Sequence, residues 1–294
     1  MGEFFGLEIH VTQPDVRPPD VAPAEARRRG WLWSPSMSAS AAIHGGALAT
    51  TVIDPVLWPW TLSAVAANHA ILTAAGLWPR SRLLGPNWNR LPSISGARRE
   101  VAITIDDGPD AEVTPRVLEM LAAHGARATF FCVGERVERH AGLARDIVRQ
   151  GHAIENHSQR HRHNFSLLGP RGMQAEIARA QDSIGGVTGS RPRFFRAPAG
   201  LRNPFLDPVL TRLDLRLASW TRRGFDTVNR DPEAVYRRLT TGLCGGEILL
   251  LHDGNAARGV SGIPVILDVL PRLLDAVHAA GLQTVTLRAA QARE

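Results

Sequence analysis

Cysteine, lysine and an apolar run near the first residue are scarce or absent in this sequence of 294 residues. There are two cysteines, Cys132 and Cys244, and each lies in or beside an apolar run. This placement indicates two buried free thiols and gives no basis for a disulfide framework. No apolar run begins near Met1, which argues against a cleavable signal peptide.

The sequence also lacks a dense block of basic residues, although its formal net charge is +6. Lysine is absent, so all 34 basic side chains are arginines, and they are spread along the chain. This pattern predicts no nucleic-acid partner. A diffuse basic surface suits anionic partners such as lipid headgroups or phosphorylated glycans. Apolar residues make up 44% of the chain and charged residues 21%, which predicts a sizeable folded core.

Composition divides the chain into four segments. Residues 1–38 are polar and proline-rich and are expected to be a disordered tail, with Met37 as an alternative start of translation. Residues 39–79 are predicted to form a hydrophobic, membrane-associated helical segment. Residues 80–98 are expected to be a linker, and residues 99–294 the main domain.

The second half of the hydrophobic segment has the length of a membrane span. As a helix, residues 56–78 would extend roughly 34 Å, with Trp58 near one end and Trp78 at the other. Asn68, His69 and Pro59 argue against a span, and the alternative is an amphipathic or buried helix pair packed on the main domain. Arginines flank the segment on both sides, which suits a hairpin with both ends in the cytoplasm. We therefore expect association with a bacterial inner membrane, with the main domain on either the periplasmic or the cytoplasmic face.

From residue 101 onward, short apolar strands alternate with helical stretches. Seven such alternations predict an α/β fold in which parallel strands form a closed, or nearly closed, barrel. An open doubly wound sheet is the alternative, but no glycine-rich phosphate loop follows the first strand. The expected strands are residues 101–105, 128–133, 152–156, 193–197, 215–220, 247–251 and 283–287.

Polar residues of a few types follow these strands. A parallel barrel carries its functional groups at the C-terminal ends of its strands, so these side chains are expected to meet on one rim. They are Asp106 and Asp107 after the first strand, His157, His161 and His163 after the third, Arg196 at the end of the fourth, Trp220, Arg223 and Asp226 at or after the fifth, and His252 after the sixth.

Two adjacent carboxylates and a histidine pair predict a metal site. Asp106 and Asp107 carry adjacent negative charges that would repel each other unless a cation binds nearby. The simpler alternative is an ordinary acidic turn after a strand. His157 and His161 are four residues apart and can face the same way. Two imidazoles and one carboxylate form a hydrolytic site, chiefly for zinc, with cobalt, nickel or manganese as alternatives. The second carboxylate then serves as the base for a metal-activated water, whereas His163 is expected beside the site or on the surface.

Four ordered motifs, TIDDGP, HSQRH, RAPAG and LLLHD, resemble those of the polysaccharide deacetylases of carbohydrate esterase family four, the NodB-homology domain. The resemblance covers about residues 98–294. It implies a distorted (β/α)7-type barrel, here preceded by an N-terminal hydrophobic helical segment. It also implies a hydrolase of carbon–nitrogen bonds other than peptide bonds, which removes acetyl groups from N-acetylated or O-acetylated carbohydrate by means of a divalent metal.

The resemblance further implies roles for the matching residues, namely a tethered base, a metal site, an oxyanion donor, an acetyl pocket and an oriented general acid. These residues are Asp106 (base) and Arg196 (its tether), Asp107, His157 and His161 (metal), Ala199 (backbone N–H for the oxyanion), Leu250 and Trp220 (substrate pocket), His252 (acid) and Asp226 (which orients the acid).

Two positions depart from the family's pattern. Ala199 stands where an aromatic residue is frequent, and Thr227 follows Asp226 where tryptophan is usual, so Asp226 is alternatively an acid in a surface turn. These departures favour a smaller or lipid-linked sugar over a long polysaccharide. Two alternatives remain: a deacylase or deformylase of a lipid-linked sugar at the cytoplasmic membrane face, and a non-catalytic glycan-binding domain. The retained acids and histidines argue against the latter, and the sequence leaves the oligomeric state open.

Overall fold

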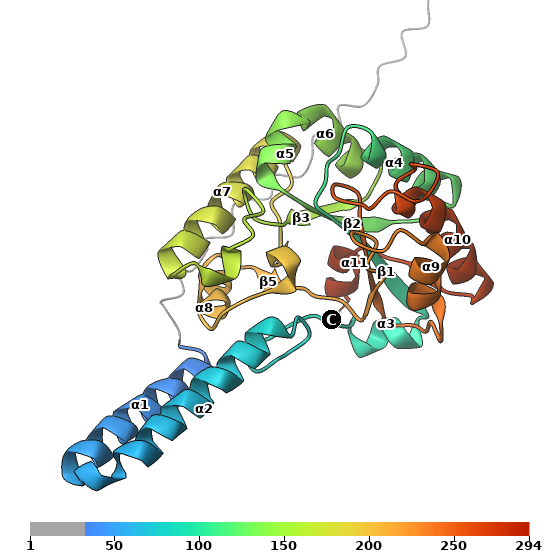
Figure 1. Cartoon of the computed structure of the whole chain (residues 1–294). Helices are drawn as coiled ribbons and strands as arrows, with labels where there is room; N and C mark the ends of the chain where they lie inside the picture. Colours follow the sequence, from blue (N-terminus) through green and yellow to red (C-terminus); the bar gives the residue numbers. More distant parts are fainter. Residues whose placement is uncertain (1–32, 294) are drawn as a thin grey trace, which may run out of the picture.

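The structure, a computed structural model, describes residues 33–293 and consists of a strand–helix barrel with a helical hairpin attached (Figure 1). The sheet has the order β5-β4-β3-β2-β1-β7-β6, with β8 pairing beside β1, and its pairings are parallel. Successive strands therefore wind around an axis, and β5 and β6 form the two ends of the open barrel. The prediction of a distorted (β/α)7-type barrel with an N-terminal helical segment is confirmed.

The strands are β1 (Glu100–Asp106), β2 (Ala128–Cys132), β3 (Ala153–Asn156), β4 (Phe194–Phe195), β5 (Arg216–Leu217), β6 (Arg222–Arg223), β7 (Ile248–His252) and β8 (Gln283–Thr284). The α-helices are α1 (Pro35–Ile53), α2 (Trp58–Leu77), α3 (Ser93–Ala97), α4 (Val113–Ala123), α5 (Gly134–Arg139), α6 (Ala141–Arg149), α7 (Pro170–Thr188), α8 (Leu206–Arg212), α9 (Pro232–Thr240), α10 (Val265–Ala279) and α11 (Leu287–Gln291). Three 3₁₀ turns, η1 (Pro55–Leu57), η2 (Phe165–Leu167) and η3 (Pro198–Gly200), complete the order. The short strand β6 was not among the seven expected.

Alternation along β1 separates the packing core from the functional interior. Successive side chains of a strand point to opposite faces. Ile103 and Ile105 therefore pack into the large outer core beneath the helices, whereas Ala102 belongs to the inner cluster. Thr104 and Asp106 share the face of Ala102, so the first acid of the pair points into the barrel.

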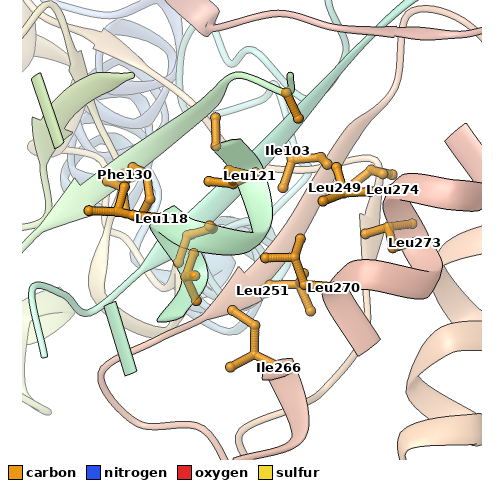
Figure 2. Packing of buried hydrophobic residues seen from close by; sticks show 14 of the residues in the cluster. Ile103, Leu118, Leu121, Phe130, Leu249, Leu251, Ile266, Leu270, Leu273 and Leu274 are labelled. Atoms are coloured by element: carbon orange, nitrogen blue, oxygen red, sulfur yellow. The ribbon is translucent and has the colours of Figure 1, made fainter. Parts of the chain in front are cut away.

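The outer core fixes the strands that carry the site. Figure 2 shows Ile103 of β1 and Leu249 of β7 beside Leu274 of α10, and Leu251 of β7 beside Leu270 of the same helix. All of these side chains are buried. Complete burial of one such side chain stabilises the fold by about 1.5–3 kcal/mol, so this layer holds the barrel strands firmly in place.

The segment 80–98, predicted to be a linker, packs against the barrel. Trp88 forms an isolated parallel bridge with Ala218, just after β5, and its ring lies edge-on to Phe194 at 5.1 Å. The carbonyl oxygen of Asn89 accepts a 2.7 Å hydrogen bond from the hydroxyl of Thr221, just before β6. This segment therefore covers the opening between the two end strands.

Helices α1 and α2 form a hairpin that projects away from the barrel (Figure 1). Polar side chains face each other between the helices: His44 contacts His69 at 3.2 Å, and Asn68 donates to Ser40 at 2.9 Å. Asn68 and His69, which argued against an apolar span, thus serve the contact between the helices. Helix α1 begins at Pro35, so the last residues of the predicted tail are helical, and the tail up to residue 32 lies outside the described residues.

Two predictions need correction. Cys132 is buried, but Cys244 is exposed because it lies in the turn before β7 rather than in the strand itself. Within residues 33–293, no helix has the combination of length and apolarity needed to cross a membrane, so the span predicted for residues 56–78 is not supported. Its interruption by polar residues such as Asn68 accounts for the difference.

Candidate active site

Two histidines and an aspartate meet at the C-terminal rim of the barrel. Oδ1 of Asp107 lies 3.2 Å from Nε2 of His157 and 3.1 Å from Nε2 of His161. One ligand atom from each of the three residues lies within 4.8 Å of the others. The structure therefore brings together the three residues predicted to bind metal.

Local backbone geometry produces this convergence. Asp107 follows the last residue of β1 and adopts a left-handed conformation with φ of 77°, which directs its carboxylate away from that of Asp106. His161 is also left-handed, with φ of 48°, in the loop after β3. Non-glycine residues in this region carry strain, which concentrates at functional sites.

The three residues fit a divalent metal. Oδ1 of Asp107 is buried and lacks a hydrogen-bond partner, although two imidazole nitrogens lie beside it. In a tetrahedral zinc site, neighbouring ligand atoms are separated by roughly 3.3 Å, close to both observed distances. Nδ1 of His157 donates to the carbonyl oxygen of Arg196 at 2.8 Å, so Nε2 keeps its lone pair for a ligand. Asn255 donates to Oδ2 of Asp107 at 2.8 Å and leaves Oδ1 free.

Burial and neighbouring charges shift the pKa values of all three residues of the cluster. Burial would raise the pKa of Asp107, but the adjacent His157 and the charges of His252 and His161 bring it well below its usual range. Burial lowers the pKa of His157, yet Asp106 and Asp107 together raise it. Burial and the neighbouring His157 lower the pKa of His161 to about 4, so this imidazole is neutral and available as a ligand.

Asp106 lies beside this cluster and is held by a buried arginine. Nη1 of Arg196 donates to Oδ1 of Asp106 at 2.7 Å and to the hydroxyl of Thr104 at 2.8 Å. The guanidinium also donates to the carbonyl oxygens of Ala218 and Ser219, and it lies 4.0 Å from the centre of the Phe131 ring. Oδ2 of Asp106 remains 3.9 Å from Nε2 of His157, so this oxygen faces the metal cluster.

His252 and Asp226 form a second pair across the cavity. Nδ1 of His252 donates to Oδ1 of Asp226 at 2.9 Å, and the backbone N–H of His252 donates to Oδ2 at 2.7 Å. Burial would lower the pKa of His252, but the charge and hydrogen bond of Asp226 raise it to about 9. The imidazole is therefore protonated at neutral pH. Asp226 is buried beneath the site, which excludes the alternative of an acid in a surface turn.

A cavity of about 530 Å³ joins these groups. Arg196 and Asp226 lie behind its wall, and His163 is exposed at its edge, 6.4 Å from the ring of His161. The remaining residues of the predicted site line the cavity together: Asp106, Asp107, His157, His161, Ala199, Trp220, Leu250 and His252.

Several residues of the cavity were not anticipated from the sequence. Asn255 orients Asp107, and Nη1 of Arg136 donates to the carbonyl oxygens of Asp107 and Gly254 at 2.9 and 3.0 Å. Asn255 follows the LLLHDG stretch directly, so its position after β7 was the available signal. Arg136 lies on α5, where nothing in the sequence distinguishes it from other surface arginines.

Comparisons with known proteins agree with this geometry. Residues 94–218 match the model of the polysaccharide deacetylase family. A peptidoglycan-N-acetylglucosamine deacetylase of Bacillus cereus is 31% identical over 175 residues, which are 59% of this chain and 81% of the relative. A chitooligosaccharide deacetylase of Sinorhizobium fredii is 32% identical over 200 residues, 65% of this chain and 91% of the relative. The structure of a family 4 carbohydrate esterase from Streptomyces lividans, solved with acetate, superimposes with a TM-score of 0.57 at 31% identity, covering 63% of this chain and 91% of that one.

A parallel barrel whose rim gathers acids, imidazoles and a hydrogen-bonded acid–histidine pair defines a hydrolase. The chain belongs to the polysaccharide deacetylase family, carbohydrate esterase family four. The prediction of a carbohydrate deacetylase, made from four short motifs, is confirmed.

Proposed function

We propose that this protein removes acetyl groups from N-acetylated or O-acetylated carbohydrate and depends on a divalent metal, most simply zinc. One observation carries the proposal: the metal-ligating atoms of Asp107, His157 and His161 converge beside Asp106. The relatives from Bacillus cereus and Sinorhizobium fredii, named for N-acetylglucosamine and chitooligosaccharide substrates, support an N-acetylated hexosamine. A non-catalytic glycan-binding domain has no need for the retained base and acid.

The residues of this chain divide the reaction between two sides of the cavity. Asp107, His157 and His161 would hold a divalent cation, which when bound would supply the Lewis acidity that activates water and polarises the acetyl carbonyl. Asp106 accepts the proton of the attacking water, and Arg196 holds its carboxylate in place by a hydrogen bond to Oδ1. The backbone N–H of Ala199 stabilises the tetrahedral oxyanion. His252 then donates its proton to the departing nitrogen as the carbon–nitrogen bond breaks, releasing acetate and the free amine.

Substrate fit follows from the wall of the cavity. Leu250 and Trp220 line it and offer an apolar surface to the acetyl methyl group. Trp220 is only 7% exposed, so it forms a fixed wall rather than a mobile cover. Ala199 also lines the cavity, and its small side chain leaves that part of the wall open.

A lipid-linked sugar is the second candidate substrate, and one specific feature favours it. A separate cavity of about 610 Å³ lies between the hairpin and the barrel. Its lining is largely apolar and includes Met37, Leu72, Leu77 and Phe205. Leu201 lines this cavity, whereas the preceding Gly200 lines the catalytic one, so the two cavities adjoin across a single loop. A hydrocarbon chain bound in the apolar cavity beside the hairpin would place the attached sugar at the catalytic cavity.

We further propose that the hairpin attaches the protein to the inner membrane of a bacterium. Its far end exposes large apolar side chains, with Ile53 83% and Val56 81% exposed. Trp58 and Trp60 lie beside them and are 57% and 75% exposed. Such an apolar surface with tryptophans suits insertion into the bilayer interface. A topology reporter fused after Glu294 distinguishes a periplasmic from a cytoplasmic catalytic domain.

Chelation tests the proposed hydrolysis. Treatment of the purified chain with a chelator should stop acetate release from chitooligosaccharides, and zinc or cobalt should restore it. The Asp106→Asn variant is the control, because re-addition of metal should not restore its activity. Full activity after removal of all metal would contradict the proposal.

A further inference from the structure

The lining of the catalytic cavity contains four arginines, and not all of them have an ion-pair partner among the described residues. Arg136 is engaged by backbone carbonyl oxygens, and Arg160 pairs with Glu135 at 3.0 Å. The other two show no ion pair with the described residues. The four arginines of the lining are Arg136, Arg139, Arg160 and Arg223.

Arg223 lies on the strand next to the one that carries the catalytic histidine. It belongs to β6, where it pairs in register with Leu250 of β7, two residues before His252. Its guanidinium lies 5.4 Å from the ring of Trp220 and 5.0 Å from the ring of Phe225. These two rings hold the charged group at the wall of the cavity by cation–π contact.

The guanidinium is nevertheless incompletely satisfied. Nε of Arg223 is buried and has no hydrogen-bond partner within residues 33–293. Arg223 as a whole is half-buried, but a buried N–H group without an acceptor is unfavourable, and the two rings offer Nε no oxygen acceptor. Oδ1 of Asp106 is paired with Arg196, and no ion pair joins either acid of the lining pair, Asp106 or Asp107, to Arg223. Arg223 therefore has no anionic partner among the described residues, and a molecule bound in the cavity can supply one.

We propose that Arg223 binds an anionic group of the substrate, so that the protein acts on an acetylated sugar carrying a phosphate or a carboxylate. This inference rests on the proposed function, since it assigns the substrate class of the same site. The fork of a guanidinium matches either anion with two parallel hydrogen bonds. Arg139, exposed at the rim, adds a second positive charge along the path of entry. A neutral sugar would leave both unpaired.

Calorimetry tests the binding directly. The full chain, stripped of metal so that phosphate has no cation to bind, is titrated with N-acetylglucosamine, N-acetylglucosamine 6-phosphate and N-acetylmuramic acid. We expect at least one anionic sugar to bind about tenfold or more tightly than the neutral one. Comparison of the two anionic sugars identifies phosphate or carboxylate as the preferred group.

Three variants assign that preference. Arg223→Met keeps the apolar stem and should reduce the preference to about threefold or less, whereas Arg223→Lys should retain part of it. Arg238→Met is the matched control, because Arg238 stacks on Phe225 at 5.4 Å but lies outside the cavity lining. Its preference should equal that of the unaltered chain. Equal affinity for charged and neutral sugars, no binding of any sugar, or the same loss in Arg238→Met would overturn the inference.

Turnover by the zinc-loaded chain separates this inference from the proposed function. Acetate release from neutral and anionic sugars alike, without preference, would leave the deacetylase in place and remove the role of Arg223. Charge-dependent binding without acetate release from any of the sugars would retain the anion site and refute the proposed hydrolysis. We expect the preference for anionic sugars to lie in KM, and we expect added salt to reduce that preference.

Discussion

Nη1 of Arg196 donates a 2.7 Å hydrogen bond to Oδ1 of Asp106, and both side chains are buried. The carbonyl oxygen of the same arginine accepts a hydrogen bond from Nδ1 of His157. One residue therefore orients both the proposed base and a proposed metal ligand. This arrangement separates the work of the two adjacent acids, because Asp106 is held by a guanidinium while Asp107 faces the imidazoles.

Asp106→Asn should abolish catalysis without loss of metal. The amide keeps the shape of the side chain but accepts no proton from water, so kcat/KM should fall by about 10²–10⁴. Elemental analysis should find the same zinc content as in the unaltered chain. Asp182→Asn, which changes an exposed acid on α7, is the control. Near-normal turnover by Asp106→Asn would show that another group accepts the proton.

His157→Ala should weaken zinc binding severely, whereas His163→Ala should not. His157 offers Nε2 to the cluster, while His163 is exposed beside it. Loss of His157 also removes the donor to the carbonyl oxygen of Arg196, which should lower the free energy of unfolding by about 1–3 kcal/mol. Zinc titration and thermal unfolding measure the two effects. Equal zinc affinity in both variants would remove His157 from the metal site.

Asp226→Asn should move the basic limb of the pH profile to lower pH. Burial lowers the pKa of His252, and Asp226 more than offsets this to raise it to about 9, so the acid form is lost only as pH rises through that value. Without the carboxylate the pKa falls, and kcat/KM should decline from a pH at least one unit lower, or roughly 1.4 kcal/mol of interaction. His252→Gln should show no such limb at all. A profile of Asp226→Asn that overlays the unaltered one would contradict the assignment of His252 as acid.

The double variant Trp58→Ser, Trp60→Ser should bind lipid vesicles about tenfold or more weakly than the unaltered chain, because it removes apolar surface from the far end of the hairpin. Cosedimentation with vesicles of phosphatidylglycerol and phosphatidylethanolamine measures the binding. Trp78→Ser, at the base of the hairpin, is the matched control and should bind normally. No vesicle binding by the unaltered chain, together with concentration-dependent dimers in sedimentation, would assign this surface to a second copy.

Gly200→Ala should impair both stability and activity. Gly200 has a φ of 75°, and a Cβ there would lie 2.6 Å from Trp220 and 2.9 Å from Pro79. The loop that carries Ala199 would have to move, at a cost of about 1–3 kcal/mol in unfolding free energy. Gly189→Ala is the control, because Gly189 has a similar φ of 69° but open space around it. Denaturant unfolding and kcat/KM should separate the two, with only Gly200→Ala losing activity.

The residues that gather at the site could be predicted from the sequence because the C-terminal ends of parallel strands meet at one rim of the barrel. Asp106, Asp107 and His252 each follow an apolar run long enough to identify as a strand, and β1 pairs with β7 so that Asp106 stands opposite His252. Strand β6 was missed because its two residues, Arg222–Arg223, are both charged and half-buried, so no apolar run marks them as a strand. Contacts such as that between Asn255 and Asp107 span 148 positions, and local pattern carries no record of them.

The hairpin illustrates a different limit. Its apolar composition indicated a helix, but composition alone did not show that Asn68 would bond to Ser40 across the pair. That contact depends on how two helices face each other, which is decided by packing over 28 positions of the chain. The span was therefore predicted from hydropathy alone, whereas the polar residues within it serve the contact between the two helices.

Anomalous diffraction from zinc-loaded crystals of the full chain tests the central claim most directly. A single strong peak at the zinc edge is expected between Oδ1 of Asp107 and the Nε2 atoms of His157 and His161, at about 2.0–2.2 Å from each. Absence of a peak at that position, or a peak coordinated by other side chains, would contradict the account.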